Sequence, residues 1–228
     1  MYNTKMLTIN TCFFNNLRLI TSIAELCAIF KLLNMRHFNS LLILTFFAVS
    51  FGQVNAQTYL ESNKKCSEIL KDIPIGDSIF WVRLGQRDSC LIGLKAPSVS
   101  VTTITNERIK TENLNGKVIF LNFWFTRCQP CIKEMPTLNK IVKKYKTKNV
   151  EFISFANEDS GKLKEFLKSN KFHFKIVPSA GHILIETFKL FAAWPTSIII
   201  DRNGIIRFIR NGVIEQGEII ELLDSLLK

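Results

Sequence analysis

Histidines and cysteine pairs, the usual ligands of structural zinc, are scarce in this sequence. Its 228 residues include three histidines and six cysteines, and only one cysteine pair, Cys128 and Cys131, has two residues between its members. A closed zinc site needs four ligands, and the sequence has no second Cys-x-x-Cys pair and no histidine pair to complete one. We therefore predict no metal and no cofactor. Half of a zinc site, or two purely structural cysteines, are the alternatives to a chemical role for this pair.

A long apolar run of the kind that spans a membrane is also missing. The uncharged stretch from Leu41 to Phe51 is too short for an ordinary span. It follows the short basic start Met35-Arg36-His37 and precedes Val54-Asn55-Ala56, small residues suited to cleavage. This order predicts a secretory signal peptide over residues 35–56.

Residues 1–34 precede the natural start of that signal peptide. We interpret them as an over-extended N-terminus, with Met35 as the true first residue, and a functional N-terminal extension is the alternative. The signal peptide predicts a periplasmic or otherwise extracytoplasmic protein. An uncleaved signal that serves as a membrane anchor stays open.

Removal of the first 56 residues leaves four of the six cysteines. An even number of cysteines in an exported protein suits an oxidising compartment. Cys66 and Cys90 lack the spacing of a redox motif, so a structural disulfide between them is the simplest assignment. Two free buried thiols stay open as the alternative.

The charge of the chain is strongly positive but gives little functional information. Lysines and arginines number 30 against 19 acidic residues, for a net charge of +11. Many lysines fall on two predicted helices, and no aromatic or RNA-binding motif accompanies them. We predict no nucleic-acid partner and interpret the lysines as solvated helix faces, which at most favour acidic partners or an anionic membrane surface.

The apolar pattern divides the rest of the chain into two parts. Residues 57–92 show no clean period, and we interpret them as an N-terminal extension packed on the following domain. From residue 93 the pattern predicts the order β–β–β–α–β–α–β–α–β–β–α, which indicates an α/β fold with a central mixed sheet flanked by helices and an N-terminal hairpin. The expected strands are 99–105, 108–111, 118–125, 150–156, 172–177, 197–201 and 205–210, and the expected helices are 132–145, 162–169, 183–191 and 219–227.

The Cys128–Cys131 pair stands at a special place in this pattern. It follows the buried strand expected at 118–125 and opens the next helix. Cys128 would then lie at the helix N-terminus, where free backbone N–H groups and the helix dipole stabilise a thiolate. Cys131 falls on the same face and within bonding reach. Such a dithiol can attack another disulfide and then close on itself, which is thiol–disulfide exchange.

Several further motifs surround this pair. They are Gly93-Leu94-Lys95-Ala96-Pro97, Leu114-Asn115-Gly116-Lys117, Asn122 to Cys131, Glu134-Met135-Pro136, and Trp194-Pro195-Thr196 before Ser197 to Asp201. Together they resemble the thioredoxin superfamily, and within it the exported TlpA-like and ResA-like thiol–disulfide oxidoreductases, over residues 93–228. The resemblance implies a thioredoxin-like fold and thiol–disulfide oxidoreductase activity.

The resemblance also implies roles for individual residues. Cys128 would be the nucleophile and Cys131 the resolving thiol, joined as a redox-active disulfide. Pro195 would be a cis-proline facing them and would bind substrate together with Trp194 and Thr196. A trans proline that merely opens a strand is the alternative. The implied substrates are cysteine pairs of exported proteins, apocytochrome c among them, and we expect a membrane electron donor and a monomer.

Two further residues are candidates for supporting roles. Glu134 lies one helical turn after Cys131 and could accept its proton, whereas an ordinary exposed helix glutamate is the alternative. Arg127 stands where many thioredoxin-like motifs carry tryptophan, and its charge would favour the Cys128 thiolate and recruit acidic substrates. An exposed arginine without catalytic effect is equally compatible. Asn122 replaces the buried aspartate of cytosolic thioredoxins, which leaves Glu134 as the nearby proton acceptor.

Other functions compete with reduction of protein disulfides. A DsbA-like oxidant is the first, since a stabilised thiolate makes the disulfide more oxidising. A peroxiredoxin shares the fold but places its reactive cysteine after Thr-x-x, and Thr126-Arg127-Cys128 has one residue too few. A Sco-like copper chaperone needs a Cys-x-x-x-Cys pair, which is one residue longer than the pair in this chain.

Overall fold

The computed structural model describes residues 58–228, which fall in one compact unit. The signal peptide expected over residues 35–56 and the over-extended N-terminus expected over residues 1–34 lie outside these residues. Within the described part, no helix has the length and the apolar character needed to cross a membrane.

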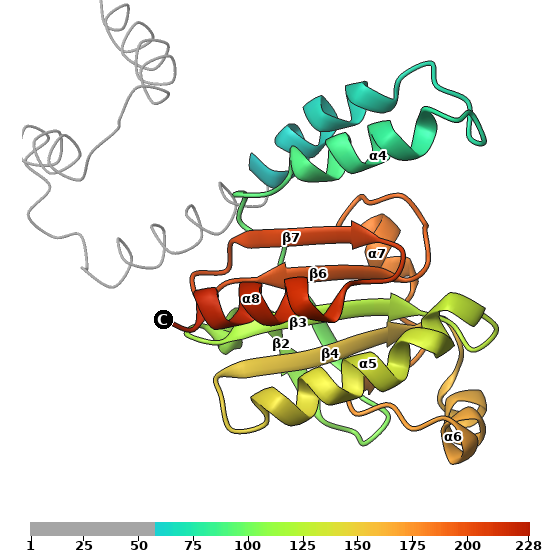
Figure 1. Cartoon of the computed structure of the whole chain (residues 1–228), viewed down its shortest axis with the longest axis vertical. Helices are drawn as coiled ribbons and strands as arrows, with labels where there is room; N and C mark the ends of the chain where they lie inside the picture. Colours follow the sequence, from blue (N-terminus) through green and yellow to red (C-terminus); the bar gives the residue numbers. More distant parts are fainter. Residues whose placement is uncertain (1–57) are drawn as a thin grey trace, which may run out of the picture. The chain divides into compact units, whose positions relative to one another are not determined.

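A five-stranded mixed sheet forms the centre of the fold (Figure 1). Its strands lie in the order β5–β4–β3–β6–β7, where β3, β4 and β5 run parallel and β6 and β7 run antiparallel to their neighbours. The strands are β3 (Val118–Trp124), β4 (Val150–Ala156), β5 (Lys175–Val177), β6 (Thr196–Ile200) and β7 (Ile206–Asn211). This confirms the predicted mixed sheet and the predicted order of elements.

The central strand β3 is buried on both faces. All seven of its residues are buried, as expected for a continuous apolar sequence in the parallel part of a sheet. Val118 and Phe120 face one core, whereas Ile119 and Leu121 face the other. This alternation follows from the two-residue period of a strand.

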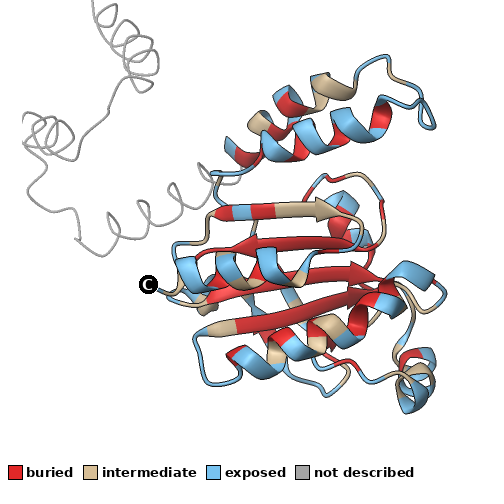
Figure 2. Cartoon of the chain, in the orientation of Figure 1, coloured by how far each residue is buried: buried red, intermediate tan, exposed pale blue. Residues whose placement is uncertain are grey.

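Helices cover both faces of the sheet, and Figure 2 shows its central strands β3 and β6 as buried throughout. Residues of α5 (Gln129–Tyr145), α6 (Ser160–Ser169) and α8 (Gln216–Leu226) enter the core on one face. Residues of α7 (His182–Glu186) and of the N-terminal hairpin enter the core on the other. The predicted hairpin is present as a separate two-stranded sheet of β1 (Ser100–Thr102) and β2 (Arg108–Lys110), followed by the short 3-10 helix η3 (Thr111–Leu114).

Helix α7 is shorter than the sequence predicts. The apolar pattern favours a helix over residues 183–191, but α7 ends at Glu186, so the predicted C-terminal half of this helix is wrong. The Phe188 carbonyl accepts hydrogen bonds from Tyr59 and Asn63, and Lys189 adopts a positive φ of 50°. Contacts from a distant part of the chain thus replace the helical hydrogen bonds that the local pattern favours.

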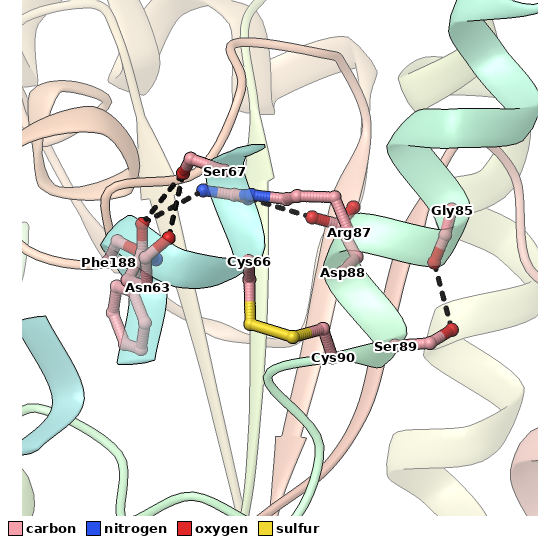
Figure 3. Close-up of a disulfide and its surroundings, with 9 residues drawn as sticks. All are labelled: Asn63, Cys66, Ser67, Gly85, Arg87, Asp88, Ser89, Cys90 and Phe188. Carbon is pink, nitrogen blue, oxygen red and sulfur yellow. Dashed lines mark hydrogen bonds and ion pairs between the residues drawn. A yellow bond between two sulfur atoms is a disulfide. The ribbon is translucent and has the colours of Figure 1, made fainter. Parts of the chain in front are cut away.

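The extension is a pair of helices joined by a disulfide. A helix over residues 58–67 continues into the 3-10 helix η2 (Glu68–Leu70), and α4 (Phe80–Ser89) follows after a loop. Cys66 and Cys90 form a disulfide between the two helices, with 5.8 Å between their Cα atoms (Figure 3). Tyr59, Cys66 and Leu91 enter the core that also contains α7.

Charged residues concealed the helical period of α4. Its buried positions are Phe80, Leu84, Arg87 and Asp88, and this spacing is helical. Because two of the four are charged, an apolar pattern does not reveal the buried face. The extension therefore has regular structure where the sequence shows no clean period.

We expect loss of the Cys66–Cys90 disulfide to destabilise the protein. The two cysteines are 24 positions apart, and a closed loop of this length contributes about 3 kcal/mol by restricting the unfolded chain. Replacing both cysteines with alanine should lower the free energy of unfolding in urea, without reductant, by this amount. The Cys128–Cys131 disulfide remains in both proteins, which makes the comparison specific. An unchanged urea midpoint and slope would contradict the expectation.

Candidate functional site

Cys128 lies at the junction between β3 and α5. It is the N-cap residue of α5, and its sulfur accepts a hydrogen bond from the Cys131 backbone N–H at 3.2 Å. The helix starts here because Gln129 is its first residue and Pro130 stands in its first turn, where the fixed φ of proline suits a helix and no N–H bond is lost. The predicted position of Cys128 at a helix N-terminus is therefore what the structure has.

Cys128 and Cys131 are joined by a disulfide, with 5.2 Å between their Cα atoms. Their exposed fractions are only 3% and 2%. Free N–H groups and the helix dipole at this end of α5 favour negative charge. When the disulfide is reduced, the same environment stabilises Cys128 as a thiolate, which is the reactive form of the thiol.

Glu134 lies inside the protein, one helical turn after Cys131. It is 2% exposed, so the alternative of an exposed helix glutamate is wrong. Its Oε1 accepts a hydrogen bond from the Ile214 backbone N–H at 2.7 Å, while Oε2 has no hydrogen-bond partner in the described part of the chain. Burial raises the pKa of Glu134 to about 7, against the lowering effect of the Ile214 N–H and the Asn122 amide.

Asn122 is buried in the middle of the sheet beside this carboxyl group. Its Nδ2 donates to Ser197 Oγ on β6 at 3.1 Å, and the two residues are partners in the antiparallel register. The amide carries no charge and cannot take the proton of a thiol. The titratable group beside Asn122 is therefore Glu134, which lies on α5.

The loop that contains Pro195 lies beside the end of β3. The Trp194–Pro195 peptide bond is cis, and Thr196 pairs with Phe123 in the antiparallel register. Trp194 also packs edge-on against Phe125, with 6.0 Å between ring centroids. The structure thus brings the three predicted substrate-binding residues to the strand that leads into the dithiol.

Arg127 is not engaged with the dithiol. Its side chain is exposed, and it makes no hydrogen bond or ion pair with any other residue that the structure describes. The contacts thus match an exposed arginine. A role in favouring the Cys128 thiolate stays a prediction.

Glu158 is a site residue that sequence reasoning missed. Its Oε1 accepts two hydrogen bonds from Thr126, from the backbone N–H at 3.0 Å and from Oγ1 at 2.7 Å. The parallel register pairs Trp124 with Ala156, so positions two residues further on also meet. A carboxylate just beyond β4, opposite a threonine just beyond β3, was the available signal. Through these two bonds, Glu158 holds Thr126 and with it the short segment between β3 and Cys128.

Comparison with known proteins agrees with this geometry. Residues 92–209 match the AhpC/TSA family. The thiol-disulfide oxidoreductase ResA of Bacillus cereus is 36% identical over 131 residues, which cover 57% of this chain and 75% of that protein. The chain belongs to the ResA-type thiol-disulfide oxidoreductases of the AhpC/TSA family.

Two further proteins, one compared by sequence and one by structure, are also similar to this chain. The thioredoxin-like protein YneN of Bacillus subtilis is 31% identical over 136 residues, covering 58% of this chain and 78% of that protein. A crystal structure from Chlorobium tepidum, provisionally assigned as the thiol:disulfide interchange protein DsbE, has a TM-score of 0.54 and 25% identity. It covers 60% of this chain and 98% of its own. The predicted thioredoxin-like fold and the predicted enzyme class are thereby confirmed.

We expect the stability of this ResA-type protein to fall as Glu134 ionises. The folded carboxyl group, with a pKa of about 7, holds its proton more tightly than the unfolded one at 4.5. Its contribution to stability is therefore fully present below the unfolded pKa and is lost as the pH rises through the folded pKa. Between about pH 5 and about pH 8 this group should lower the free energy of unfolding by about 2 to 3 kcal/mol.

Glu134→Gln provides the comparison, because it keeps the size of the side chain and removes the ionisation. Urea unfolding of both proteins at the two pH values should show a smaller decline for the variant. Equal declines would mean that Glu134 ionises in the folded protein as easily as in the unfolded chain.

Proposed function

We propose that this protein is an extracytoplasmic reductant of disulfides in exported proteins, acting through the Cys128-Gln129-Pro130-Cys131 dithiol. The observation that carries the proposal is the place of Cys128, whose sulfur caps α5 and bonds to Cys131. The cis Trp194–Pro195 loop at the adjacent strand end supports it, since an extended peptide can pair with backbone at the end of a strand. Kinship with ResA supports the reaction class.

The reaction balances as two successive exchanges. The Cys128 thiolate attacks one sulfur of the substrate disulfide, which forms a mixed disulfide and releases the other substrate sulfur as a thiolate. Cys131 then loses its proton and attacks the Cys128 sulfur, so that the second substrate thiolate leaves. The substrate gains two electrons and two protons, and the enzyme retains the Cys128–Cys131 disulfide. A dithiol donor, which we assign to the membrane, must reduce this disulfide before the next cycle.

Glu134 is the proposed acceptor of the Cys131 proton. A general base works best when its pKa lies near the working pH, and burial brings the pKa of Glu134 to about 7. Its unpartnered Oε2 leaves one oxygen available for a proton. After resolution, the same carboxyl group can return the proton to the departing substrate thiolate.

The proposed location and substrates rest on the sequence. The signal peptide predicted over residues 35–56 supports export, with or without retention as an anchor, and persistent disulfides suit an oxidising compartment. Exported cysteine pairs such as those of apocytochrome c are the proposed substrates, and a monomer is the proposed state. DsbA-like oxidation is the competing direction, because the helix N-terminus also favours a thiolate. The reduction potential against glutathione separates the two, since thioredoxin lies at roughly −270 mV and DsbA at roughly −120 mV.

Single-cysteine variants test which thiol attacks. Because only Cys128 caps the helix, Cys131→Ser should accumulate mixed disulfides with oxidised exported proteins, which non-reducing gels and mass spectrometry detect. Cys128→Ser should accumulate none. Equal accumulation in the two variants would reverse or remove the assignment of the nucleophile.

A Glu134→Gln variant tests the proton acceptor. Stopped-flow measurement of a preformed mixed disulfide should show resolution slowed at least about tenfold near neutral pH, a modest loss for a general base. In the wild type, the resolution rate should rise as the pH passes through about 7, the pKa of Glu134. Attack by Cys128 should change much less. Identical pH profiles for resolution in the two proteins would show that the proton leaves directly to water.

A further inference from the structure

Side chains of the extension hold the loop that follows α7. Tyr59 Oη donates to the Phe188 carbonyl at 2.7 Å, and Asn63 Nδ2 donates to the same oxygen at 3.2 Å. Arg87 donates to the next carbonyl, that of Lys189. All three donors belong to the two helices that the Cys66–Cys90 disulfide joins. Figure 3 shows Asn63 and Arg87 beside this disulfide. The extension thereby fastens the backbone of the loop that leads to the cis-proline.

A second connection reaches the residue after the cis-proline, Thr196, through the half-buried side chain of Asn211. Asn211, the last residue of β7, donates its amide to the Asp88 carboxylate. The Thr196 hydroxyl can donate to Asn211 Oδ1, 2.8 Å from Oγ1, and the Ala193 carbonyl, at 2.6 Å, competes for the same proton. Thr196 directly follows Pro195. When this proton goes to Asn211, a line of hydrogen bonds runs from Asp88 on α4 through Asn211 to Thr196.

The line of hydrogen bonds begins at the buried ion pair of Arg87 and Asp88, in which the orientation of the Asp88 carboxylate is fixed. Arg87 Nη1 donates to Asp88 Oδ1 at 2.8 Å, and the two side chains are 3% and 4% exposed. A buried pair of this kind adds little net stability relative to apolar packing, but its charge-assisted hydrogen bonds have a defined geometry. One oxygen of Asp88 faces Arg87 and the other faces Asn211, so the carboxylate can turn in neither direction.

The backbone next to Asn211 completes the link. The Gly212 N–H donates to the Pro195 carbonyl at 2.7 Å. Asn211 and Gly212 thus hold two successive residues of the loop, Thr196 by its side chain and Pro195 by its backbone. A shift of Asn211 would move both.

We propose that Asp88 is a positioning residue for the loop Trp194–Thr196, which it holds through Asn211 in the geometry that pairs with an incoming substrate peptide. The inference rests on the proposed function of this loop. Asp88 precedes residues 92–209, which match the AhpC/TSA family. The positioning is therefore a contribution of the extension to the active site of the domain that follows it.

Two variants test the proposal on the full chain. Asp88→Asn removes the charge at the start of the line, and Asn211→Ala removes the middle of the line while leaving the Arg87–Asp88 pair in place. The probe substrate is an oxidised synthetic peptide with a Cys-x-x-Cys-His pair. Both variants should raise the KM for this peptide about tenfold, the loss expected for one hydrogen bond to a charged group. The kcat and the rate at which iodoacetamide alkylates reduced Cys128 should change less than about twofold, because Asp88 touches neither thiol.

Hydrogen exchange supplies a readout that needs no substrate. The Gly212 N–H should exchange faster in both variants, since its bond to Pro195 loosens. Leu163→Ala, in the buried part of α6, is the matched control: it destabilises the core away from the line and should leave both the KM and Gly212 exchange unchanged. The proposal would be overturned if Gly212 exchange were unchanged in both variants, or if exchange were faster but the KM unchanged. An equal rise of the KM in Leu163→Ala would also overturn it. A wild type that reduces no peptide disulfide would overturn the proposed function instead, and faster Gly212 exchange in the variants would still support the positioning.

Discussion

Burial of β3 on both faces is the constraint on which the rest of the structure depends. Because every side chain of this strand is enclosed, its register with the neighbouring strands cannot slip without turning apolar side chains toward the wrong core. That register places Glu158 against Thr126 and Thr196 against Phe123. The sheet therefore sets the position of the dithiol, and the short segment before Cys128 connects the dithiol to β3.

Two different features of the site act on its acidic groups. The N-terminus of α5 favours negative charge at Cys128. Burial disfavours the charged form of Glu134 and raises the pKa of its carboxyl group to about 7. A carboxyl group whose pKa lies near neutral pH is suited to accept a proton there, which is the role proposed for Glu134 toward Cys131.

The extension explains features that the thioredoxin-like domain alone does not. Its side chains donate hydrogen bonds to the carbonyls of Phe188 and Lys189. These bonds hold the loop that follows the early end of α7. Its ion pair, Arg87–Asp88, lies where apolar residues would pack with less desolvation cost. Both observations support the proposal that the extension positions the loop Trp194–Thr196. Stapling by Cys66–Cys90 keeps the two helices that supply these groups together.

The sequence by itself determined the order of the strands and helices, the central place of β3 and the position of Cys128 at the start of α5. These follow from local patterns: an apolar run, a helical period and a proline in the first turn of a helix. Only the tertiary structure decided the burial of Glu134, the role of Glu158, the early end of α7 and the helices around Arg87 and Asp88. Each of these depends on contacts between residues far apart in the chain, where burial and long-range hydrogen bonds override the local pattern.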